Sequence, residues 1–184
     1  MKRLAFFALF LYAYLQVLMT GTVVFQTFVM YPNIFRNPPE SLSLSMDFFK
    51  SVAPGDFFPP FGAAIVITGV LCLIVSFRHK KSFYYFLGSV LLLFGGDGIL
   101  SILYFWPRNE ILFVEGPAKH SAETLQFVAA EFYRAHYLRL ITSTLASLAA
   151  MIGLVKAVFT VQWGKDLPLS AHSPEDRHDI EGFV

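Results

Sequence analysis

The stretch "FYYFLGSVLLLFGGDGILSILYFW", Phe83–Trp106, decides the fold of this chain. It is longer than the roughly 20 apolar residues that a helix needs to cross a lipid bilayer. Asp97 is its only charged residue and lies in its second half. The stretch therefore predicts a membrane-spanning helix that carries one carboxylate inside the apolar segment.

Three further runs have the same character: Leu4–Tyr31, Phe61–Phe77 and Tyr137–Val161. Hydrophobic residues make up 55% of the 184 residues and charged residues only 15%, whereas about 25% of a soluble domain is charged. We therefore predict an all-α integral membrane protein, with residues 1–163 forming a bundle of four transmembrane helices. Residues 164–184 are predicted to form a polar, disordered cytoplasmic tail.

The first run follows Met-Lys-Arg, so a cleaved signal peptide is an alternative to a membrane helix. A signal peptide has an apolar core of only ~7–15 residues, followed by a small-x-small cleavage site. This run is longer and shows no convincing cleavage site, so an uncleaved helix is expected.

Basic residues predict the orientation of the bundle. They precede the first run, fill the short turn between the second and third runs, and follow the fourth: Lys2, Arg3, Arg78, Lys80, Lys81 and Lys165. The two longer connections carry charges of both signs. By the positive-inside rule, both termini and the short turn are expected in the cytoplasm, with two structured loops on the other side.

Prolines and a serine predict where the helices begin and end. Pro32 in "YPNIF" is expected to end the first helix, and Pro107 in "WPRNEILF" the third. Pro60 is expected in the first turn of the second helix. Residues 41–52 are predicted to form a short surface helix, and Ser121 is expected at the start of the fourth long helix.

Asp97 is the clearest polar residue inside an apolar run. A charge at the centre of a membrane helix costs ~2.5–3.5 kcal/mol on insertion scales, so such residues usually face the bundle interior and pair. Neighbouring glycines allow close approach of another helix or a ligand. Two roles remain open: a carboxylate that accepts a proton or orients a ligand, and a structural partner of an arginine.

The motif "FYRAHYLR" places further polar groups where the fourth helix enters the apolar region. At about 100° per residue, Phe132, His136, Arg139 and Ser143 fall within one stripe. Arg139 needs a counter-charge, and Asp97 is at a suitable depth. For His136, a role as base or ligand contact competes with that of a plain interfacial histidine. For Arg139, binding an anionic or phenolate oxygen competes with snorkelling to the headgroups.

These residues predict a polar pocket near the outer mouth of the bundle. Membrane lipid is expected to surround the bundle, and the pocket is expected to bind an apolar small molecule. The catalytic candidates are Asp97, His136 and Arg139, and the substrate-binding candidates are Thr27, Tyr31, Trp106, Asn109 and Phe132. A closed pocket that joins the three catalytic candidates would favour an enzyme.

The sequence lacks the motifs that are typical of several classes of function. Cys72 is the only cysteine, so neither an intrachain disulfide nor a cysteine-based metal site is expected. His120 and Glu123 are too few ligands for a metal centre. The net charge of +1 gives no basic field for nucleic acid. Glycine-rich phosphate loops and haem-attachment motifs are also missing.

The motifs resemble those of the anthrone-oxygenase-like membrane family, many of whose members have no known function. The resemblance covers Leu4 to about Val161 and rests on short motifs. Pro107 and Asn109 match the end of the family's third helix, and His136 and Arg139 match the motif that opens its fourth. Phe132 departs from the pattern, because the family usually has tryptophan there.

The resemblance implies oxidation of an anthrone to an anthraquinone by O₂, without an evident cofactor in some fungal members. His136 would then act as the base, and Arg139 would hold the phenolate. A non-enzymatic protein that binds a lipid, a quinone or a partner helix is the alternative, and a small carrier is a third hypothesis. The sequence leaves the oligomeric state open, homo-oligomers included.

Overall fold

The structure is a computed structural model that describes residues 2–163, and the regular structure of these residues is helical. The predicted tail, residues 164–184, lies outside the described residues. In chain order the elements are α1 (Lys2–Phe25), the π-helical turn η1 (Gln26–Met30), α2 (Tyr31–Ile34), α3 (Glu40–Phe48), α4 (Pro54–Ser76), α5 (Lys80–Leu92), the π-helical turns η2 (Leu93–Ile99) and η3 (Ser101–Phe105), α6 (Trp106–Asn109), the π-helical turn η4 (Glu110–Glu115), α7 (Gly116–Lys119) and α8 (Ala122–Trp163).

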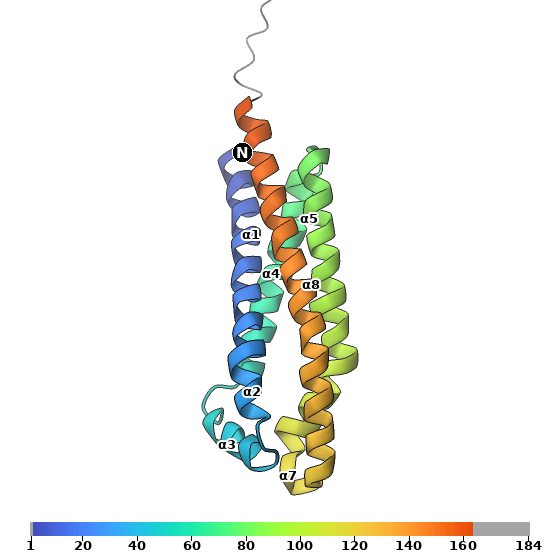
Figure 1. Cartoon of the computed structure of the whole chain (residues 1–184). Coiled ribbons are helices and arrows are strands. Elements are labelled where there is room, and N and C mark those ends of the chain that lie inside the picture. The colour runs from blue at the N-terminus through green and yellow to red at the C-terminus, as the bar shows by residue number, and fades with distance from the viewer. Residues whose placement is uncertain (1, 164–184) are drawn as a thin grey trace, which may run out of the picture.

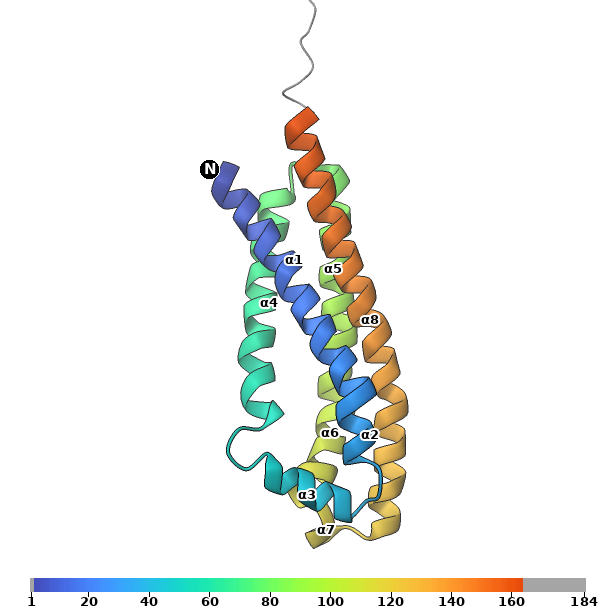
Figure 2. The same ribbon diagram turned by 60° about the vertical axis from the view of Figure 1, so that its left-hand side comes forward.

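These elements form four long, continuous helices, which confirms the predicted four-helix bundle. Each is long and apolar enough to cross a membrane: Arg3–Ile34, Pro54–Ser76, Lys80–Lys119 and Ala122–Phe159. The helices lie side by side along one axis (Figure 1). The N-terminus, the turn between α4 and α5 and the last described turns of α8 share one end, which we name the terminal end. At the opposite loop end lie α3 and α7 (Figure 2).

The first and third helices continue past their prolines, so the predicted ends at Pro32 and Pro107 are wrong. In both places a π-helical turn precedes the proline. The amide of Tyr31 donates to the Gln26 carbonyl, and the amide of Trp106 donates to the Ser101 carbonyl. The proline then occupies a first-turn position of the next α-helical segment, where its missing N–H is tolerated. The second predicted loop is therefore mostly helix, which ends at Lys119.

The other predicted boundaries agree in part. α4 begins at Pro54 rather than near Pro60, because the Asp56 carboxylate accepts a hydrogen bond from the Ala53 amide at 2.8 Å and satisfies the helix start. The predicted surface helix is present as α3. The Ser121 hydroxyl accepts from the Thr124 amide at 3.2 Å, so this residue caps α8 as expected.

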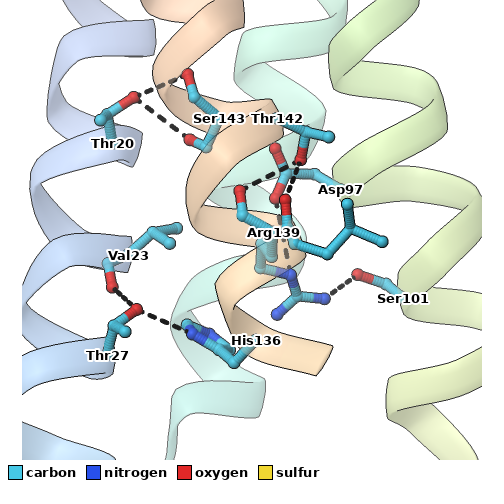
Figure 3. Close-up of polar contacts among 10 residues, drawn as sticks. Thr20, Val23, Thr27, Asp97, Ser101, His136, Arg139, Thr142 and Ser143 are labelled. Atoms are coloured by element: carbon cyan, nitrogen blue, oxygen red, sulfur yellow. Dashed lines mark hydrogen bonds and ion pairs between the residues drawn. The ribbon is translucent and has the colours of Figure 1, made fainter. Parts of the chain in front are cut away.

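Two apolar clusters hold the bundle together, and they determine where the site lies. The cluster at the terminal end centres on Tyr12 and Phe86. The cluster at the loop end centres on Phe105, Phe132 and Leu112 and ties η3 and η4 to α8. Between the clusters, polar side chains bridge the helices, and this region holds the predicted polar residues Thr27, Asp97, His136 and Arg139 (Figure 3).

Candidate functional site

A cavity of about 780 Å³ lies in the loop-end half of the bundle, and we name it the loop-end cavity. Its walls come from α1, η1 and α2 on one side, α4 on a second, and η2 and η3 on a third, while α8 closes the back. The residues near α3 form its end towards the loops. The walls are mainly apolar, and the volume falls in the range of ~300–1,000 Å³ that is usual for small-molecule sites.

Arg139 and Asp97 are the charged pair in the wall of this cavity. Arg139 Nε lies 3.6 Å from Asp97 Oδ1, and both side chains are largely buried. An Arg139 amino group also donates to the Ser101 hydroxyl (Figure 3). The guanidinium lies over the ring of Phe105, 4.0 Å from its centroid. The predicted pairing of Asp97 with Arg139 is therefore confirmed.

Each of these two charged groups has one buried polar atom without a hydrogen-bond partner within residues 2–163. Asp97 Oδ2 and Arg139 Nε are buried and have no hydrogen-bond partner among the described residues. A carboxylate oxygen only accepts hydrogen bonds, and a guanidinium nitrogen only donates them. The charged pair in the cavity wall therefore has one acceptor and one donor for which the described residues supply no hydrogen bond.

The π-helical turns explain how polar groups reach this wall. Asp97 lies in η2, Ser101 in η3, and Gln26 in η1. Each turn widens the helix locally and changes the direction of the side chains that follow, and such turns are frequent at functional sites.

His136 lies one layer behind the cavity wall. It is fully buried, and its Nδ1 lies 2.9 Å from the Thr27 hydroxyl (Figure 3). That hydroxyl donates its single proton to the Val23 carbonyl at 2.7 Å. Nδ1 of His136 therefore donates to Thr27, and in the neutral imidazole this leaves Nε2 with a lone pair. Nε2 is buried and has no hydrogen-bond partner within the described part of the chain.

Three aromatic rings separate His136 from the cavity. The ring of Tyr31 lies 4.6 Å from that of His136, the ring of Phe105 5.9 Å and the ring of Phe132 6.2 Å, measured between centroids. These three residues line the cavity, whereas His136 does not.

The structure thus sorts the predicted site residues into two groups. The lining residues are Tyr31, Asp97, Trp106, Asn109, Phe132 and Arg139. Thr27 and His136 form the buried pair behind them. The polar pocket predicted from the sequence is present only in part, because Asp97 and Arg139 line the cavity whereas Thr27 and His136 do not. The role of His136 as a base stays a prediction.

Sequence reasoning missed several lining residues. Ser101 escaped notice because a serine in an apolar run is common, and only its pairing with Arg139 gives it meaning. Gln26 is buried at the wall, although a glutamine inside an apolar run is a signal that was available. Phe49 and Lys50 reach the cavity from the end of α3, which only tertiary structure reveals.

Other charged residues at the loop end stabilise the fold rather than the site. Arg108 forms an ion pair with Glu131 at 2.9 Å and lies over the ring of Tyr104. His120 contacts Glu115 at 2.6 Å rather than Glu123. Among residues 2–163, no group of three or more His, Cys, Asp or Glu side chains is arranged to hold a metal ion.

Comparison with known protein families, curated proteins and solved structures gives no match to this chain. The function must therefore be argued from the cavity and its chemistry. The observations that carry that argument are the apolar walls, the Asp97–Arg139 pair and the buried His136.

Proposed function

We propose that the protein binds an apolar small molecule with a phenolic hydroxyl in the loop-end cavity. The observation that supports this proposal is the charged pair of Asp97 and Arg139 in a mainly apolar cavity wall, with Asp97 Oδ2 and Arg139 Nε left without a hydrogen-bond partner among the described residues. A phenolic hydroxyl donates one hydrogen bond and accepts another, so it complements both atoms. A simple carbonyl complements only Arg139, and a hydrocarbon complements neither.

The walls favour a flat, aromatic ligand body. Four aromatic residues line the cavity, namely Phe58, Phe105, Trp106 and Phe132. Aromatic rings pack well against one another in offset or edge-to-face arrangements. The hydroxyl of such a ligand would lie against Arg139 while its rings occupy the apolar space.

Phenanthrol, a three-ring phenol, should bind more tightly than phenanthrene, which has the same rings without the hydroxyl. Hydrogen bonds to charged groups contribute ~1.5–3 kcal/mol, so the dissociation constants should differ by about ten-fold or more. Displacement of tritiated phenanthrol from the protein in nanodiscs measures both constants, with empty nanodiscs subtracted. Equal affinities would contradict recognition of the hydroxyl.

Two variants locate this preference. Asp97→Asn keeps the size of the side chain but removes the charge of the acceptor, so the preference for phenanthrol should shrink. Arg134→Ala is the matched control, because Arg134 is exposed and does not line the cavity. It should leave both affinities unchanged.

We propose an oxygenase activity as the second candidate function, favoured by a base and a cation on one wall. Asp97 would remove a proton from the CH₂ group of an anthrone, and Arg139 would stabilise the aromatic phenolate that this leaves on the ring oxygen. The phenolate would then react with O₂ at the same carbon, and loss of water from the resulting hydroperoxide would give the carbonyl. One O₂ is consumed and one water is released, which balances the reaction of an anthrone to an anthraquinone.

Anthrone in nanodiscs, followed by O₂ consumption and quinone absorbance, tests the activity. Asp97→Asn should lower turnover by about 100-fold or more, the contribution expected of a general base. Arg139→Lys should weaken binding, because the planar guanidinium is lost. His136→Ala should have a smaller effect than Asp97→Asn, since His136 lies behind the aromatic rings. The opposite order would make His136 the base.

The proposed orientation places the terminal end in the cytoplasm. Basic residues are concentrated there: Lys2, Arg3, Arg78, Lys80 and Lys81. The loop-end cavity would then lie in the outer half of the membrane.

Cysteine labelling in a Cys72→Ala background tests this orientation. Ser45→Cys in α3 should react with a membrane-impermeant maleimide added to intact cells. Ser173→Cys should react only after the cells are opened, because the chain that follows α8 is expected inside. The reverse pattern would overturn the orientation without affecting the cavity.

A further inference from the structure

We infer that the loop-end cavity opens sideways into the lipid bilayer, through a portal between α4 and the segment formed by η2 and η3. The ligand then enters from the membrane rather than from water. The inference deepens the proposed function and rests on it for the identity of the ligand. The opening itself rests on the arrangement of the helices.

Two stripes of residues form the lips of this portal. Gly62 and Val66 lie one turn apart on α4, with Phe58 a turn before them, and all three line the cavity. Phe94, Gly98, Ile102 and Trp106 follow at intervals of four on the opposite helix and also line the cavity. Phe94, Ile102 and Trp106 are 44%, 53% and 59% exposed, so their side chains reach both the cavity and the outside of the bundle.

The two lips diverge towards the loop end. α4 packs mainly against α1 and α5, and both views show it separating from the helix that carries η2, η3 and α6 (Figures 1 and 2). The cavity occupies the space between them. Gly62 and Gly98 stand on opposite lips and add no side chain to the space between them.

The lips must lie in the hydrocarbon region. α4 has 23 residues, which at 1.5 Å per residue is only just enough to cross a core of ≈ 30 Å. Residues 58–66 therefore lie inside the bilayer whichever way the bundle is oriented. An opening at this level faces acyl chains, and an apolar aromatic compound is concentrated there by partition.

The open space at both glycines provides a way to close the portal. A β-carbon at Gly62 meets no atom within 4 Å, and one at Gly98 comes no closer than 3.8 Å to its neighbours. Phenylalanine at both positions should therefore fold and fill the gap. Gly21 and Gly88 are equally open but do not line the cavity, so Gly21→Phe with Gly88→Phe is the matched control.

Photolabelling with trifluoromethyl-phenyldiazirine, an apolar aromatic probe that partitions into nanodiscs, tests the portal. Met19 and Leu93 are buried residues of the cavity wall, whereas Ile67 and Leu103 are exposed and lie outside it. In the native protein we expect label at all four. In Gly62→Phe with Gly98→Phe, label at the two buried residues should fall to background while the two exposed residues stay labelled.

Two outcomes would overturn the portal. Unlabelled Met19 and Leu93 in the native protein would show that membrane-borne molecules do not enter. Undiminished label in the Gly62→Phe, Gly98→Phe variant would show entrance by another route, for example from the end of the cavity that Lys50 lines.

Competition with phenanthrol tests the identity of the ligand separately from the existence of the portal. Excess phenanthrol should protect Met19 and Leu93 more than phenanthrene does, with Leu103 unprotected by either. Equal protection by both compounds would reject recognition of the hydroxyl while leaving the portal supported.

Discussion

Replacing Gly96 by alanine should lower the stability of the bundle by about 3 kcal/mol. A β-carbon at this position would overlap the hydroxyl and the Cβ of Thr142 on α8. Since Thr142 is β-branched and its Cβ is fixed to the backbone, the overlap is relieved only if η2 and α8 move apart. Thermal unfolding in detergent, followed by circular dichroism, measures the loss.

Gly95→Ala is the control for this change. It adds the same methyl group one residue earlier in η2, where a β-carbon meets no atom within 4 Å. Both substitutions reduce the freedom of the unfolded chain in the same way. The difference between the two midpoints therefore isolates the helix contact, and equal midpoints would show that η2 and α8 do not pack this closely.

The four-helix bundle could be predicted because a helix that crosses the hydrocarbon core of a bilayer must be long and mostly apolar, and such segments can be recognised from composition. An apolar segment as long as Phe83–Trp106 would expose too much apolar surface in water, so its length and composition indicate a membrane span. The pairing of Asp97 with Arg139 follows from the same reasoning, since an unpaired charge in an apolar run is costly.

The continuation of the helices through Pro32 and Pro107 could not be predicted. A proline ends most helices because it lacks an N–H and clashes with the preceding turn. Here π-helical turns shift the hydrogen bonds before each proline, and no simple residue pattern in η1 or η3 marks such a shift. Local preference was therefore overridden by a backbone adjustment that tertiary packing stabilises.

The position of each site residue relative to the cavity could be found only from the structure. The stripe on α8 correctly grouped Phe132, His136 and Arg139 on the inward side. Helical periodicity gives direction but not distance, so it could not show that Phe132 and Tyr31 would stand between His136 and the cavity. The position of a ring relative to a cavity depends on neighbours from other helices.

Removing Arg139 should destabilise the protein by about 3 kcal/mol, because Asp97 would remain buried without its counter-charge. Asp97→Ala should have a similar effect for the converse reason. The double variant Asp97→Ala, Arg139→Ala leaves neither charge unpaired, so it should recover part of the loss. Thermal unfolding of the four proteins in one detergent forms a double-mutant cycle.

This cycle separates a structural ion pair from a recognition site when Arg139→Lys is added to it. Lysine keeps the charge beside Asp97, so most of the stability should return, but it lacks the planar arrangement of donors that holds a hydroxyl. If stability and the preference for phenanthrol over phenanthrene fell together in every variant, the pair would serve the fold alone. A lysine variant that is stable yet no longer distinguishes the two ligands would show that the guanidinium faces the ligand, and additive losses in the cycle would show that the two charges do not interact.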